Sequence, residues 1–216
     1  MKLLNQLERK MYRLRIAPFF HYVIFAMAGV YALDLLFPSF GLIYRLSLIM
    51  PMVYGGEIWR LVSFIVLPSA GNILYAALSM YFYYIIGTTL ESKWGPRRFL
   101  LYFLIGVLGA ILAAVITQFG TNRYLFLSMF FAYAMINPEQ ELLLFFVVPV
   151  KMKWIALLNA VYFIYVLIVG SWSMKAAVLL SLLNLFLFFG GDIINLIRRS
   201  LQQYRRRRMF RKAQQR

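Results

Sequence analysis

The chain has 216 residues, of which 63% are hydrophobic and 14% are charged, and its formal net charge is +16. A soluble globular protein is about 45–50% apolar and about 25% charged, so this composition excludes an ordinary soluble domain and predicts a membrane protein. With no cysteine and one histidine, disulfides and thiolate chemistry are excluded and almost nothing remains to bind zinc. We therefore expect no cofactor and no metal site.

Six apolar segments are predicted to cross the membrane as helices, since a bilayer core needs about 20 apolar residues. The first follows a basic stretch, as in a signal peptide, but it lacks a small-residue cleavage site and is treated as a helix. The fourth is short, and is either a helix tucked into the centre or one that continues beyond Pro138. The predicted spans are Phe19–Phe37, Ile73–Leu90, Phe99–Phe119, Tyr124–Ile136, Trp154–Val169 and Ala176–Ile197.

The connection Ser39–Asn72 is too long and too apolar to be a solvated, structureless loop. We predict an ordered structure lying in the outer-leaflet interface. There, Trp59 can sit at headgroup depth, and Arg60 can tie loop carbonyls together with its five donors. Glu57 stands three residues before Arg60 and could pair with it if the stretch is helical. The alternative is a plain interfacial anchor with an arginine that reaches the surface.

A second segment, "ELLLFFVVPVKMKW", does not fit a simple span either. It is bounded by Glu141 and Lys151, and Pro149 would break any helix through it. We predict a short hairpin or a re-entrant stretch on the inner side of the membrane.

Lysine and arginine decide the predicted orientation. With the N-terminus inside, all of the 23 Lys and Arg residues except Arg45, Arg60, Arg123 and Lys175 fall on the cytoplasmic side. This predicts a basic cytoplasmic N-terminus at 1–18, a membrane domain at 19–197 and a basic cytoplasmic tail at 198–216. The tail is expected to attract anionic lipid headgroups, with contact to RNA as a less favoured alternative. The charge bias and the lack of cysteine fit a bacterial plasma membrane.

The order of several motifs resembles the rhomboid superfamily. A Trp-Arg pair lies in a large first loop, a Gly and a Leu-Glu pair follow in the second helix, and Gly and Arg-Phe open the third. The stretch "NPEQELLLFFVVPVKMKW" is similar to the segment after that family's fourth helix. The resemblance runs from about residue 15 to 197 and implies an all-α, six-helix membrane bundle whose first loop is embedded in the membrane, with both termini cytoplasmic. The residues that carry it are Trp59, Arg60, Gly87, Leu90, Glu91, Gly95, Arg98 and Phe99.

The catalytic motifs of active rhomboids are missing. Those enzymes resemble one another in a Gly-x-Ser-Gly at the start of the fourth helix and a His in the sixth, and this chain has neither. The family's serine would fall near Arg123, and Tyr75 and Ser79 stand where active members tend to have His and Asn. The resemblance therefore implies a pseudoprotease similar to the derlins, which are implicated in binding and moving membrane-protein substrates.

A rebuilt serine site is not expected. Ser128 is the only serine of the fourth span and His21 is the only histidine. From the helical rise we place them nearly 20 Å apart in depth, whereas a base must lie within about 3 Å of its nucleophile. Nothing orients Lys175 toward Ser128 either, so we expect the Ser128 hydroxyl to bond back to the preceding turn of its own helix.

The remaining polar and small residues of the spans leave alternatives open. Gly106, Ala110 and Ala114 predict close helix packing, with dimerisation as the alternative. Asp192 is expected to be neutralised by a nearby basic residue, with ion handling as the alternative. Asn159 and Asn184 could bond across helices or line a polar cavity for a substrate helix.

The favoured function is therefore non-enzymatic recognition of membrane-protein clients, with no catalytic residues. The alternatives are an intramembrane serine protease with a non-standard site, and a small transporter whose path is lined by Asp192, Asn159 and Asn184. Few intramembrane charges and no visible inverted repeat argue against the transporter.

Overall fold

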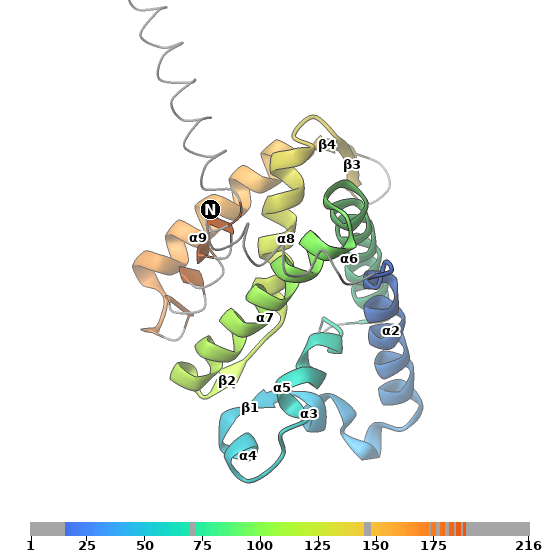
Figure 1. The fold of residues 1–216 in the computed structure, drawn as a ribbon, viewed down its shortest axis with the longest axis vertical. Helices are drawn as coiled ribbons and strands as arrows, with labels where there is room; N and C mark the ends of the chain where they lie inside the picture. Colours follow the sequence, from blue (N-terminus) through green and yellow to red (C-terminus); the bar gives the residue numbers. More distant parts are fainter. Residues whose placement is uncertain are drawn as a thin grey trace, which may run out of the picture.

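The computed structural model describes residues 16–69, 72–144 and 148–172, followed by single positions of the last predicted span (Figure 1). Most of Ala176–Ile197, including Asn184 and Asp192, lies outside the described residues, as do residues 1–15 and the basic tail. The described single positions are 174, 175, 178, 179, 182, 183, 185, 186 and 188.

Five of the six predicted spans contain a described helix within a few residues of the expected bounds. Within the described residues, α6, α7 and α9 are long and apolar enough to cross a membrane, and α2 joins them if it is counted with the bent segment that follows it. This is the pattern of a multi-pass integral membrane protein. The helices are α2 (Phe20–Leu36), α6 (Ile73–Trp94), α7 (Pro96–Thr117), α8 (Arg123–Ile136) and α9 (Met152–Val169).

The junction between α6 and α7 is set by two adjacent residues. Gly95 adopts a φ of +79°, which L side chains rarely tolerate, and it ends α6. Pro96 then opens α7, where its missing N–H has no helical partner to lose. The helix therefore runs one turn beyond the predicted end at Leu90 before the chain reverses.

Helix α8 is the centre of the molecule. It packs against α6, α7 and α9, and most of its side chains are buried. Its 14 residues span about 21 Å at the helical rise, less than the roughly 30 Å of a bilayer core. The fourth segment is thus the tucked central helix, and it ends at Ile136 without continuing beyond Pro138.

Small residues let the helices approach closely around this centre. A Cβ added at Gly87 of α6 would lie 2.0 Å from the Phe20 ring of α2, so only glycine fits there. In α7, Gly106 and Ala114 are buried and Ala110 is half-buried. The small-residue stripe is therefore used for packing inside the chain.

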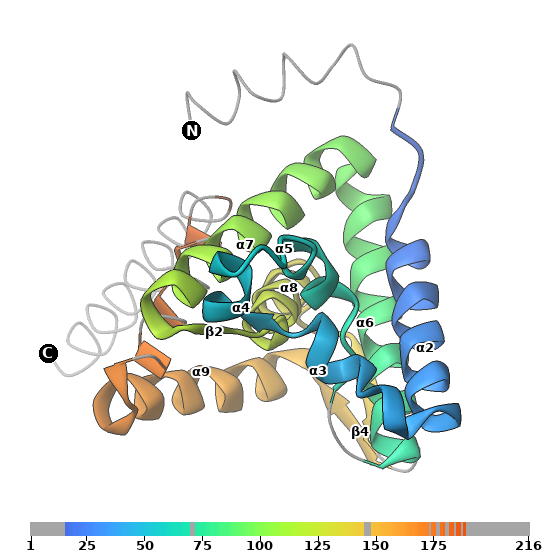
Figure 2. The same ribbon diagram turned by 90° about the horizontal axis from the view of Figure 1, so that it is seen from below.

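The connection after α2 is ordered, as predicted, and consists of short elements. The chain bends by 102° between Phe20–Leu36 and Pro38–Leu46, which turns it sideways relative to α2. Seen from the loop end, α3, α4 and α5 lie across the end of α8 (Figure 2). The elements are η1 (Pro38–Phe40), α3 (Leu42–Leu46), β1 (Leu48–Ile49), α4 (Met50–Tyr54), α5 (Arg60–Ser63) and η2 (Phe64–Val66).

The described residues are mostly helical, as predicted, and two short antiparallel sheets join the connections. Strand β1 pairs with β2 (Phe119–Gly120), which ties the first loop to the end of α7. Strands β3 (Glu141–Leu144) and β4 (Val148–Lys151) form the hairpin that the apolar segment predicted. Both pairings satisfy backbone groups in the connections between the long helices.

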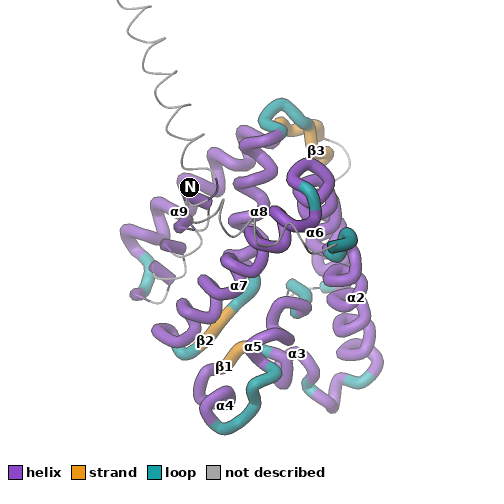
Figure 3. Tube along the Cα trace, in the orientation of Figure 1, coloured by secondary structure: helices purple, strands orange, loops and turns teal. Residues whose placement is uncertain are grey.

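The hairpin and the first loop lie at opposite ends of the helices (Figure 3). At the hairpin end, the Glu139 carboxylate accepts hydrogen bonds from Lys153 Nζ at 2.6 Å and Lys151 Nζ at 3.0 Å. These bonds hold the pKa of Glu139 below its ordinary value of 4.5, and the carboxylate in turn raises the pKa of Lys151. The opposite placement is what the predicted inner hairpin and outer loop require.

Candidate functional site

The first loop is built around the side chain of Arg60, which is only 2% exposed. Its Nη1 donates to the carbonyls of Tyr44 at 2.6 Å and Ser47 at 2.7 Å. Its Nε donates to Glu57 Oε2 at 2.7 Å, and Nη2 lies 2.7 Å from the same oxygen. One guanidinium thus holds α3, the turn before β1 and the start of α5 together, where a planar fork of donors is needed.

The neighbours of Arg60 complete this arrangement. Ser63 Oγ donates to the Leu46 carbonyl at 2.9 Å, and the guanidinium carbon of Arg60 lies 5.6 Å from the centre of the Tyr44 ring. Trp59 points outward with 54% of its surface exposed. The charged group is therefore structural, while the indole is presented at the surface of the loop.

Two other motif residues, Glu91 and Arg98, lie near the junction of α6 and α7. Glu91 is 3% exposed, and its Oε1 accepts a hydrogen bond from the Phe19 N–H at 2.8 Å, 72 residues away. This bond satisfies a backbone donor at the start of α2, where no side chain of the same segment caps the helix. Arg98 is exposed in the first turn of α7. Glu91 thus fixes the beginning of α2 against the last turns of α6.

Ser128 and His21 do not form a catalytic pair. The Ser128 hydroxyl is buried and shares a hydrogen bond with the hydroxyl of Tyr102 on α7. The His21 ring lies 3.9 Å from the Tyr22 ring, centre to centre, and 6.4 Å from that of Phe25, so it contacts residues of its own helix. A partner across helices for Ser128 was not anticipated from the sequence.

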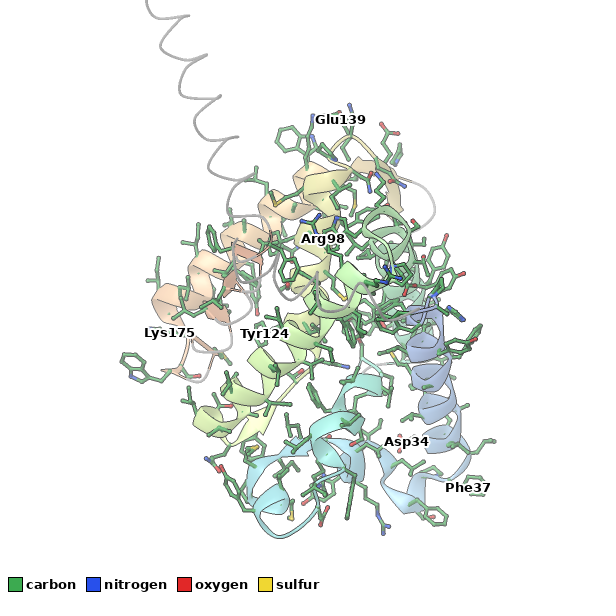
Figure 4. All side chains as sticks on the ribbon, viewed as in Figure 1. Asp34, Phe37, Arg98, Tyr124, Glu139 and Lys175 are labelled. Atoms are coloured by element: carbon green, nitrogen blue, oxygen red, sulfur yellow. The ribbon has the colours of Figure 1, made fainter. Side chains whose placement is uncertain are left out.

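The depth expected for Ser128 from the sequence stays a prediction. It assumes that α8 begins at the outer surface. Within the molecule, Tyr124, the second residue of α8, lies between the loop end, with Asp34 and Phe37, and the hairpin end, with Glu139 (Figure 4). The Phe20 and Phe126 rings are 6.4 Å apart, which brings the start of α2 near α8. The His21 ring, next to Phe20, contacts residues of its own helix.

The start of α8 is held below the loop by Asn122. Its Nδ2 donates to the carbonyls of Ile65 at 3.1 Å and Leu67 at 2.8 Å. These carbonyls belong to the segment around η2, which has few backbone partners of its own. Asn122 thereby positions the first turn of α8, including Arg123.

Beside this turn lies a cavity of about 340 Å³ between α6, α8 and α9. Its walls are mostly aromatic and aliphatic, and its polar groups come from two tyrosines, one arginine and one asparagine. Helices α6 and α9 each pack on α8, so α8 forms the floor between them. The lining residues are Tyr75, Phe82, Tyr83, Ile86, Arg123, Phe126, Leu127, Phe130, Ile155 and Asn159.

Three polar side chains of the cavity have defined surroundings. Asn159 Nδ2 donates to the Ile155 carbonyl of its own helix at 2.9 Å. Of the two roles considered for Asn159, bonding across helices or lining a cavity, the structure shows the second. The Tyr83 hydroxyl lies 3.2 Å from Ser69 Oγ, and its ring stacks on Phe126 at 4.0 Å. Arg123 is exposed toward the cavity side of α8.

From the sequence, Asn159 and Asn184 were placed at a possible cavity, and Arg123 was counted as an outer topological charge. The sequence did contain a signal for this cavity: Arg123 stands at the start of a span that is shorter than a bilayer core. Within the described residues, no group of three or more His, Cys, Asp or Glu side chains could hold a metal ion. Asn184 and Asp192, which were also assigned to intramembrane polar contacts, lie outside the described residues.

No protein-family model matches the chain, and no curated protein sequence matches it.

Proposed function

We propose that this protein is a non-proteolytic, rhomboid-like integral membrane protein that binds membrane-spanning segments of client proteins in the cavity between α6, α8 and α9. The observation that carries the proposal is the cavity itself: an apolar space between membrane helices with a few polar groups. Binding sites in helical bundles have this composition, since apolar walls supply area and sparse polar groups supply orientation.

The first loop supports this role as a rigid element. Arg60 and Asn122 together connect α3, α5, η2 and the start of α8. A cavity whose walls are fixed before binding loses less conformational entropy when a client enters. In the proposed topology of six spans with both termini cytoplasmic, this loop faces the outer side of a bacterial plasma membrane and the basic tail faces anionic lipids inside.

The function can be tested with a photo-crosslinking amino acid placed at Leu127 of the cavity. A matched position is Leu108, which is 59% exposed on α7 and does not line the cavity. The protein would be reconstituted in nanodiscs with single-span peptides of varied sequence. Crosslinks that form from Leu127 well above those from Leu108 would support client binding. Equal yields at both positions for every peptide would mean simple proximity in the bilayer and would refute it.

Proteolysis is the competing function, because rhomboid-like proteins include serine proteases and α8 carries one serine, Ser128. A fluorophosphonate probe applied to the reconstituted protein should give no labelling, because the Ser128 hydroxyl is paired with Tyr102 and no histidine of the chain contacts it within the described residues. Labelling that disappears in Ser128→Ala would establish a nucleophilic serine and overturn the proposal.

A further inference from the structure

We infer that Arg123 makes the cavity selective for client membrane segments that carry an aspartate or glutamate side chain. The inference rests on the proposed function and names its substrate class. Arg123 is the first residue of α8 and lines the cavity with Tyr75, Phe126 and Asn159. It is the cationic group among the cavity's lining residues.

Arg123 is exposed and lines the cavity at the first turn of α8. Asn122, its neighbour, is bonded to two carbonyls of the first loop, so the first turn of α8 lies below that loop. Tyr124, on the other side, lies between the two ends of the molecule (Figure 4). A cation at such a place is costly in hydrocarbon unless an anion or water meets it.

The acids of the described residues are engaged elsewhere. Glu57 pairs with Arg60, Glu91 accepts from the Phe19 N–H, and Glu139 pairs with Lys151 and Lys153. Asp34 accepts from the Ile43 N–H in the first loop, and Glu141 is in the hairpin at the opposite end. Within the part of the chain that the structure describes, no ion pair involves Arg123, so the cavity presents a positive charge to whatever enters it.

The rest of the lining decides between possible anions. Beyond the arginine, the walls are aromatic and aliphatic, including Phe82, Phe130 and Ile155, and the volume of about 340 Å³ suits a few side chains. One turn of an apolar helix with a single carboxylate matches both the charge and the walls. An acid inside a membrane helix has the same cost as the arginine, so the two groups stabilise each other on binding.

The test uses nanodiscs of phosphatidylcholine alone, with the photo-crosslinking amino acid at Leu127. Three single-span peptides differ only at one position in their outer third, which holds Asp, Asn or Lys. We expect the Asp peptide to crosslink about tenfold more than the Asn peptide, as one desolvated charge pair would give. Arg123→Gln should remove this preference, and Arg123→Glu should transfer it to the Lys peptide.

Arg45→Gln is the matched control, because Arg45 is also an exposed cation of the predicted outer side but does not line the cavity. It should keep the preference for Asp. Melting temperatures close to that of the wild type would show that the Arg123 variants are folded, as expected for an exposed side chain.

The outcomes separate this inference from the proposed function. Equal crosslinking of the Asp and Asn peptides would overturn the role of Arg123 and leave client binding standing. No crosslinking of any peptide from Leu127 would overturn both. A preference that persists in Arg123→Gln would also overturn the inference. If added phosphatidylglycerol abolishes the preference, a lipid phosphate is the occupant that Arg123 selects, and the inference is again overturned.

Discussion

Replacing Arg60 with alanine is expected to loosen the first loop and lower the stability of the whole protein. The change removes two hydrogen bonds, of 2.6 Å and 2.7 Å, from a charged donor to loop carbonyls, together with the contact to Glu57. A hydrogen bond to a charged group contributes about 1.5–3 kcal/mol. The Glu57 side chain is 34% exposed, so solvent screens that pair and we give it little weight.

The two carbonyl bonds alone set the expected loss in the free energy of unfolding at about 3–6 kcal/mol, similar in size to the cost of breaking a buried charge pair. For a chain of this size, each kcal/mol corresponds to about 2–4 °C in melting temperature. We therefore expect the melting temperature of Arg60→Ala in detergent micelles to fall by about 6–24 °C. Limited proteolysis should also begin to cut the chain between α2 and α6.

Two further variants make the prediction specific. Arg60→Lys keeps the charge but has one ammonium in place of a planar fork, so it cannot meet all three acceptors and should be intermediate in stability. Arg45→Ala removes an exposed arginine from the same loop and should change the free energy of unfolding by no more than about 0.5 kcal/mol. If Arg60→Ala melts at the same temperature as Arg45→Ala, the loop does not depend on the guanidinium and the reasoning fails.

Three other variants and conditions test different contacts. Gly87→Val should destabilise the protein through a clash with the Phe20 ring, measured by thermal melting, whereas Gly29→Ala, where a Cβ meets nothing within 4 Å, should be neutral or stabilising. Asn122→Ala leaves two loop carbonyls unpaired and should cost about 1–3 kcal/mol; an unchanged melting temperature would contradict its role in holding α8. The pKa of Glu139 is lowered on folding, so its stabilising contribution is present above pH 4.5 and is lost as the pH falls through the folded pKa. Carboxyl chemical shifts followed by NMR should show this low pKa in the native protein, and its return to 4.5 when both lysines are replaced by glutamine would assign the cause.

Hydrophobic stretches were sufficient to place most of the helices. Five predicted spans contain helices whose ends differ from the expected ones by a few residues, because long apolar runs and the Gly95–Pro96 junction act locally. The same local reasoning predicted an ordered first loop, since an apolar connection of that length would be costly in water. It also predicted a break at the segment before α9, which the structure forms as a hairpin.

Tertiary packing decided what local patterns do not encode. The length of Arg123–Ile136 allowed a tucked helix but did not reveal that α6, α7 and α9 all pack against it. The pairing of Ser128 with Tyr102 and of Glu91 with the Phe19 N–H joins residues that are 26 and 72 positions apart. Such contacts depend on which helix faces are turned toward each other, and periodicity is weak when a helix is apolar all round.

The candidate site shows the same division. The sequence pointed to Asn159 as a polar residue in a span and to Arg123 as an outer charge, each by its own surroundings. Only the packing of α6 and α9 on α8 brings the two side chains to one cavity. The charge of Arg123 and the apolar side chains of the walls can be read from the sequence. Their arrangement around one cavity depends on how α6 and α9 pack on the central helix α8.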